Sequence, residues 1–108
     1  MGRDFWYYWK NPNDEFCDRD ENGWTIDPER FYLDMSISRH NDFIPGYGGD
    51  YTHYTPDSLK KEIEELTKKI EEVKKSDLWE LMEAIKVFYA LLAEMVVGQK
   101  SDVWIHYN

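Results

Sequence analysis

Apolar residues recur every three or four positions between residues 55 and 75, and Lys and Glu fill most of the other positions. One narrow apolar stripe of this kind is typical of a helix that packs along a single neighbour. The Thr-Pro-Asp triplet at 55–57 marks its start, because Thr caps a helix, Pro suits the first turn and Asp favours the positive end of the dipole. We predict a helix over about 56–75. Its stripe consists of Leu59, Ile63, Leu66, Ile70 and Val73.

A second helix is predicted over about 78–97, and this segment is apolar on nearly all sides. Ser76 and Asp77 interrupt the first pattern and suit the start of a new helix, while Gly98 suits its end. A helix that is apolar on most sides is buried on most sides. The narrow stripe of the first helix covers only one of these sides. A sheet, a second subunit or both must cover the rest, which favours a homodimer.

Three other segments have the composition or the period of strands. Residues 31–39 alternate apolar and polar side chains, whereas 4–10 and 102–107 are rich in aromatic and β-branched residues. We therefore predict an α+β fold with one domain over residues 1–108. Its elements follow the order β-β-α-α-β, and a small, mostly antiparallel three-stranded sheet carries the αα-hairpin on one face.

The formal net charge is −9, and most of the excess of acidic side chains lies in residues 1–54. No stripe of basic residues exists to neutralise phosphates, so direct binding to nucleic acid is disfavoured. The negative electrostatic potential of such a chain would attract a basic protein partner. Neither a signal peptide nor a transmembrane run is recognisable, and the single Cys17 cannot form an internal disulfide. We therefore expect a cytoplasmic location without membrane contact.

Residues 39–54 form a long predicted loop and mix glycines, rings and titratable groups. A loop of this length in a compact domain is often functional. Its tyrosines either cover the end of the helical pair or contact a partner or ligand, and both interpretations stay open. The first strand adds rings, because neither of its faces is polar. The candidate partner- or ligand-binding residues are Trp6, Tyr8, Arg39, His40, Asp42, Tyr47, Tyr51, His53 and Tyr54.

The acidic segment 18–29 matches the calcium-loop pattern D-x-D-x-N-G-x5-E. Ca²⁺ prefers several oxygen ligands, and Gly23 allows the sharp turn that such a loop needs. The segment resembles an EF-hand loop, although Pro12 and a polar stretch precede it where an incoming helix is expected. The simpler alternative is a tight turn, and no other cofactor is indicated. The candidate calcium ligands are Asp18, Asp20, Asn22 and Glu29.

Catalytic motifs are weak in this chain. It has no nucleophile elbow and no zinc-type spacing of Cys and His. His40 and Asp42 are residue types suited to proton transfer, but histidines in surface loops are usually only polar. We therefore expect a non-enzymatic protein-binding module with an acidic, aromatic surface. Ring burial would anchor the partner at Trp6, Tyr47, Tyr51 and Tyr54.

One concrete version of this hypothesis is an inhibitor that masks a basic or nucleic-acid-binding surface of its partner. The small, acidic, aromatic-rich composition resembles the general profile of phage- or virus-encoded inhibitors, including those that imitate nucleic acid. The first alternative is a nucleotide-like small ligand, held by the Tyr- and Gly-rich loop 39–54 with Arg39 pairing its charge. The second is calcium binding through the loop 18–29.

Overall fold

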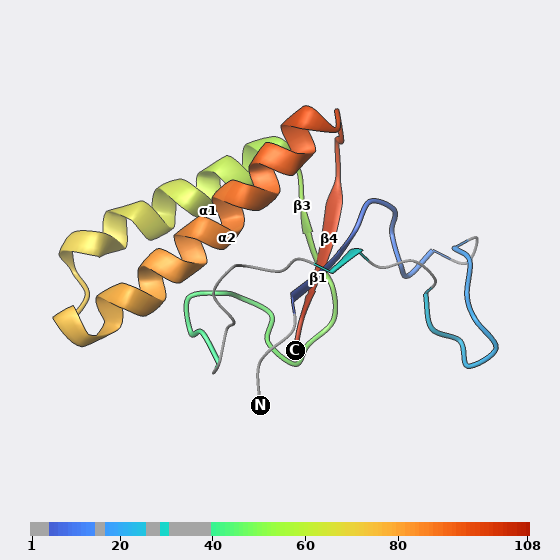
Figure 1. Cartoon of the computed structure of the whole chain (residues 1–108), viewed down its shortest axis with the longest axis horizontal. Coiled ribbons are helices and arrows are strands. Elements are labelled where there is room, and N and C mark those ends of the chain that lie inside the picture. Colours follow the sequence, from blue (N-terminus) through green and yellow to red (C-terminus); the bar gives the residue numbers. More distant parts are fainter. Residues whose placement is uncertain (1–4, 15–16, 26–28, 31–39) are drawn as a thin grey trace.

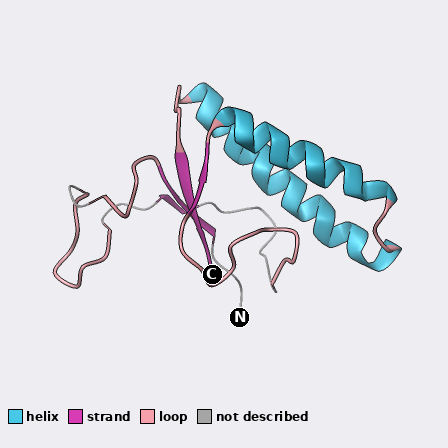
Figure 2. Cartoon of the chain, turned by 180° about the vertical axis from the view of Figure 1, so that it is seen from behind, coloured by secondary structure: helices cyan, strands magenta, loops and turns pink. Residues whose placement is uncertain are grey.

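The computed structural model describes residues 5–14, 17–25, 29–30 and 40–108. Within them, four strands form an antiparallel sheet in the spatial order β2-β1-β4-β3, and two helices form a hairpin on one side of it (Figures 1 and 2). This arrangement confirms the predicted α+β class. The elements are β1 (Phe5–Tyr8), β2 (Glu29–Arg30), β3 (Thr52–Tyr54), α1 (Pro56–Lys68), α2 (Leu78–Val97) and β4 (Val103–Tyr107).

α1 begins where the sequence predicts, because Thr55 and Ser58 form a reciprocal cap. The Thr55 hydroxyl accepts a hydrogen bond from the Ser58 amide at 3.2 Å, and the Thr55 amide donates to the Ser58 hydroxyl at 2.8 Å. α1 ends at Lys68, earlier than predicted, and two 3₁₀ turns between residues 69 and 77 lead to α2. Ile70, the first stripe residue beyond α1, is 40% exposed and so adds little packing to hold a longer helix, whereas Val73 is partly buried against the core.

α2 has the predicted bounds, but the described residues cover only part of its circumference. One side of α2 packs in the core with the α1 stripe and the sheet. The opposite side leaves large apolar side chains exposed, among them Trp79 and Tyr89. The expectation of burial on most sides is therefore not met within one chain. The buried apolar residues of α2 are Leu81, Ala84, Val87, Phe88, Leu91 and Met95.

β1 and β4 divide their side chains between two faces, as the strand period requires. The inner face joins the helices in the core, and the outer face points the other way. Antiparallel pairing places Trp6 opposite His106 and Tyr8 opposite Trp104, and these four outer side chains are half-buried. The buried inner side chains are Phe5, Tyr7, Val103, Ile105 and Tyr107.

The edges of the sheet differ most from the prediction. β3 lies within residues 39–54, which were predicted to be only a loop. The strand escaped prediction because three residues, Thr, His and Tyr, are too few to show an alternating period. β3 pairs with β4 and completes the sheet as a fourth strand. The predicted strand 31–39 falls outside the described residues. The two residues before it pair with β1 as β2.

Asn41 fixes the segment before β3 to the core. Its side chain is fully buried, and its backbone amide donates to the Tyr107 hydroxyl at 2.7 Å. The Asn41 Nδ2 donates to the Glu80 carbonyl and to Glu83 Oε1, both at 2.9 Å. Its Oδ1 accepts from the Phe43 amide at 2.9 Å. One polar side chain thus joins this segment to α2 while its backbone reaches β4.

Candidate binding surface

The outer face of the sheet carries aromatic side chains from three strands. β1 contributes Trp6 and Tyr8, β4 contributes Trp104 and His106, and β3 contributes His53. Pairing of the strands sets Trp104 between Tyr8 and His53. The His53 and Trp104 rings stack with their centroids 4.6 Å apart. We call these five residues the outer sheet face.

Tyr51, the residue before β3, extends this surface. Its ring meets Tyr8 edge-on, with 5.4 Å between centroids, and lies 5.5 Å from the His106 ring. The Asp50 carboxylate accepts a hydrogen bond from the Tyr51 amide at 2.8 Å, which orders the turn that carries both residues. Burial, and then the neighbouring Tyr51, raise the pKa of Tyr8 to about 12. The Tyr8 hydroxyl therefore stays neutral at physiological pH.

A tight turn between residues 19 and 25 brings Trp24 to the edge of this surface. Asp20 Oδ1 accepts hydrogen bonds from the amides of Asn22 and Trp24, both at 2.9 Å. Gly23 supplies the left-handed conformation of the turn, with a φ of 84°. Trp24 is nevertheless 70% exposed, because the turn holds its backbone while little covers its ring.

The outer sheet face and this turn enclose a half-open pocket of about 590 Å³. That volume lies within the usual range of ligand sites, about 300–1,000 Å³. The Asp20 and Asp50 carboxylates belong to the lining, and none of the described lining residues is Lys or Arg. The rings in the lining are Trp6, Tyr8, Trp24, Tyr51 and His106. We call this site the aromatic pocket.

The chemistry of the aromatic pocket favours a positively charged guest. The faces of indole and phenol rings are electron-rich and attract ammonium and guanidinium groups. Two carboxylates add to this attraction, and the neutral Tyr8 hydroxyl does not oppose it. In this lining a phosphate group meets two carboxylates, and none of the described lining residues is Lys or Arg. Arg19 lies next to the lining, and its guanidinium donates to the Gly23 carbonyl at 3.2 Å. The same charges that suit a cation therefore disfavour a nucleotide-like ligand.

Several predicted site residues gather on this side of the sheet. Trp6, Tyr8 and Tyr51 line the aromatic pocket, and His53 lies beside it on the same face. Tyr54 does not belong there. It is 8% exposed, its ring packs against Phe88, and burial raises the pKa of its hydroxyl. The prediction that Tyr54 anchors a partner is therefore wrong, because its β3 position points the ring into the core.

His40, Asp42 and Tyr47 form a separate cluster at the core side of the sheet. His40 Nε2 lies 3.1 Å from Asp42 Oδ1, and the His40 ring packs 4.2 Å from Tyr47 and 5.8 Å from Tyr107. Tyr107 is an inner-face residue, so this cluster does not contribute to the aromatic pocket. Arg39 lies outside the described residues.

Sequence reasoning missed Trp24, Trp104, His106 and Asp50 as members of this surface. The period of a strand puts Trp104 and His106 on the face opposite Val103, Ile105 and Tyr107. The missing information was the pairing of the last strand with the first, which places their outer rings side by side. For Trp24, the Asn22-Gly23 turn was recognised, but a turn alone does not reveal which surface it meets.

The turn interpretation of residues 18–29 agrees with the hydrogen bonds around Asp20. Among the described residues, no three His, Cys, Asp or Glu side chains gather closely enough to hold a metal ion. The Glu29 side chain is outside this description, so the calcium hypothesis stays a prediction. A melting temperature that rises with Ca²⁺ but not with Mg²⁺, and no longer rises in Asp18→Ala, would support it.

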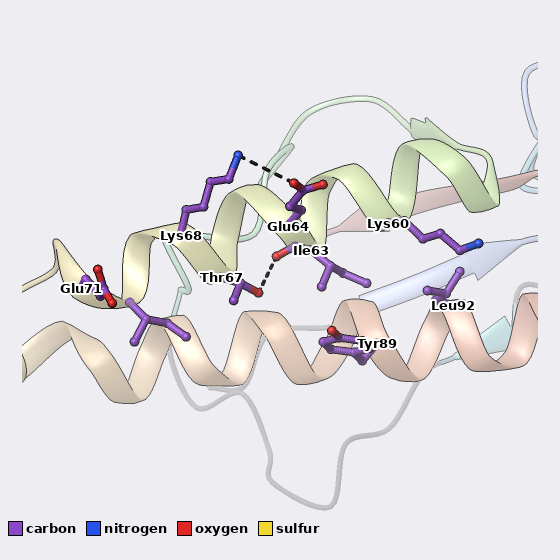
Figure 3. A pocket seen from close by; sticks show the side chains of 9 residues that line it. Lys60, Ile63, Glu64, Thr67, Lys68, Glu71, Tyr89 and Leu92 are labelled. Atoms are coloured by element: carbon purple, nitrogen blue, oxygen red, sulfur yellow. Dashed lines mark hydrogen bonds and ion pairs between the residues drawn. The ribbon is translucent and has the colours of Figure 1, made fainter.

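A second concave surface, of about 680 Å³, lies between α1 and α2 (Figure 3). Its floor is formed by apolar and aromatic side chains, including Ile63, Tyr89 and Leu92. Lys and Glu side chains of α1 alternate along one border, and Lys68 Nζ lies 3.8 Å from Glu64 Oε1. Among the described lining residues of this groove, Tyr89 supplies the one ring, and Lys60 and Lys68 balance the carboxylates of Glu64 and Glu71. The aromatic pocket is therefore the better candidate for recognition of a charged group.

Comparison of the chain with protein-family models, curated proteins and solved structures gives no match. In the part of the chain that the structure describes, no helix combines the length and apolar character needed to cross a membrane. Function is therefore inferred from the chemistry of the surface.

Proposed function

We propose that the chain is a non-enzymatic protein-binding module whose aromatic pocket receives an arginine or lysine side chain of a basic partner segment. One observation carries the proposal: five rings and two carboxylates line a single pocket on the outer sheet face. Cation–π attraction is strongest when the cation is partly desolvated, as it is in a pocket of this kind. The aliphatic part of an arginine or lysine side chain would pack against the same rings by apolar contact.

The charge of the whole chain supports a basic partner. A net charge of −9 attracts a basic surface before contact and raises the association rate at low salt. A partner that binds nucleic acid through such a surface would be masked by this module, which is the inhibitor version of the hypothesis. The small, acidic, aromatic-rich composition of the chain resembles that of phage- or virus-encoded inhibitors, which agrees with this version. The single Cys17 agrees with a reducing, cytoplasmic location.

The proposal is tested with a short arginine-rich peptide titrated into the purified protein by calorimetry. Trp24→Ala removes an exposed ring of the pocket and should weaken binding about tenfold, since a cation–π contact contributes about 1–2 kcal/mol. Asp50→Asn should weaken binding less and reduce its dependence on salt. Trp79→Ala is the matched control, because it removes another largely exposed indole, which belongs to α2 and not to the pocket lining.

Two results would contradict the proposal. The first is binding that Trp24→Ala and Trp79→Ala weaken equally, since a general loss of ring surface would then explain it. The second is equal affinity for a glutamate-rich peptide of the same length, which would exclude recognition of positive charge. Circular dichroism of each variant separates a lost contact from a lost fold.

A further inference from the structure

The exposed side of α2 carries a regular stripe that the part of the chain described by the structure leaves uncovered. Its positions are separated by three, four, three, four and three residues. Trp79, Met82, Tyr89 and Val96 are 60%, 46%, 56% and 61% exposed, although large apolar side chains are normally buried. Such spacing is typical of a helix that packs along another helix. The stripe consists of Trp79, Met82, Lys86, Tyr89, Ala93 and Val96.

This stripe is complementary to itself when a second copy runs in the opposite direction. Reversal about its midpoint sets Trp79 opposite Val96, and Met82 opposite Ala93, so large side chains meet smaller ones. The same reversal sets the Lys86 ammonium opposite the Tyr89 ring, which is a favourable cation–π pair. A two-fold axis repeats each contact, as an isologous dimer requires.

The charged border of the neighbouring groove is also complementary to itself when a second copy runs in the opposite direction. Along α1 and the 3₁₀ turn that follows it, charges alternate in sign beside the groove shared with Tyr89, in the order Lys60, Glu64, Lys68 and Glu71 (Figure 3). An antiparallel second copy would set Lys60 opposite Glu71 and Glu64 opposite Lys68. Opposite charges at both pairs favour this register and disfavour a shift by one turn. Stripe and groove are continuous, because Tyr89 belongs to both.

We propose that the outer surface of the helical hairpin binds a second copy of this chain, giving an antiparallel four-helix contact around a two-fold axis. α2 has 20 residues and is therefore roughly 30 Å long, and two adjacent helices are roughly 20 Å wide. The footprint is roughly 600 Å² per partner, near the lower limit for stable interfaces. We therefore expect a dimer that forms reversibly at micromolar concentrations.

Sedimentation velocity between about 5 and 300 µM tests this proposal. The native chain should shift from monomer to dimer, and Tyr89→Glu should stay monomeric because it places a carboxylate within the stripe. Lys60→Glu should weaken the dimer, and Lys60→Glu combined with Glu71→Lys should restore it. Trp24→Ala is the control, because its ring lies in the aromatic pocket. A monomer over the whole range, or a dimer that Tyr89→Glu leaves intact, overturns the proposal.

Cross-linking tests the direction of the helices. With Cys17 replaced by Ser, Met82→Cys combined with Ala93→Cys should give a disulfide-linked dimer under mild oxidation. Met82→Cys alone should not, because two copies of this position lie about three helical turns apart in the antiparallel arrangement. Efficient cross-linking through Met82→Cys alone would indicate parallel helices and would overturn the register.

Discussion

Asn41 is the single polar side chain on which the placement of the loop before β3 most depends. It is fully buried, and its hydrogen bonds connect this loop to α2 and to the backbone of Phe43. A buried amide of this kind is tolerated because its donors and acceptor are paired. Removal of the Asn41 side-chain amide would leave the buried Glu83 carboxylate without this donor.

Asn41→Ala should therefore lower the free energy of unfolding by about 2–4 kcal/mol, since unpaired buried polar groups cost about 1–3 kcal/mol each. Urea denaturation measures the change. Asn11→Ala is the control, because Asn11 Oδ1 accepts a hydrogen bond from the Asn13 amide in an exposed turn. A loss below about 1 kcal/mol in Asn41→Ala would contradict the assigned role.

Asp102, the residue before β4, is expected to make the stability of the fold depend on pH. Hydrogen bonds from His53 and then Ser101 lower its pKa, and the His53 Nε2 lies 2.8 Å from Asp102 Oδ1. Because the folded pKa is below the unfolded value, the stabilising contribution is complete above the unfolded pKa. It is lost as the pH falls through the folded pKa.

Asp102→Asn should accordingly melt at a lower temperature than the native chain at pH 7. The difference should shrink as the pH falls below about 4 and disappear at still lower pH. Thermal melts monitored by circular dichroism from pH 7 to pH 2 measure this. A difference that grows on acidification would contradict the assigned direction of the shift.

At the scale of elements, the sequence predicted the start of α1 and both ends of α2, because these signals are local, whereas α1 ends at Lys68 and not near residue 75. The cap at Thr55 and the end at Gly98 both fall where residue chemistry places them. β3 was missed, since three residues of mixed polarity form a strand only through pairing with β4. The aromatic pocket was predicted in part, because Trp6, Tyr8 and Tyr51 are conspicuous rings, whereas the partners from β4 depend on strand order.

The Thr55 cap is expected to stabilise α1 through hydrogen bonds within its first turn. Thr55→Ala should lower the free energy of unfolding by about 1 kcal/mol, because the Ser58 amide loses its acceptor. Thr67→Ala is the comparison, since the Thr67 hydroxyl only donates back to the Ile63 carbonyl inside the helix. Equal losses in the two variants, measured by urea denaturation, would contradict the special role of the cap.

At the scale of the whole molecule, the two proposed surfaces lie on different layers. The aromatic pocket is on the outer sheet face, and the stripe of α2 faces away from the core that the sheet and helices share. A dimer through the hairpin leaves both pockets open. Two pockets on one particle would raise the apparent affinity for a partner with repeated basic segments, without any new contact.

The aromatic pocket is tested most directly by nuclear magnetic resonance of the tryptophan side chains during titration with an arginine-rich peptide. Each indole N–H gives its own signal, and the chain places Trp24 in the pocket and Trp79 on the distant hairpin. We expect the Trp6 and Trp24 signals to shift with the peptide and the Trp79 signal to stay in place. A shift of Trp79 alone, or no shift of Trp24 at saturating peptide, would contradict recognition of a basic partner at the aromatic pocket.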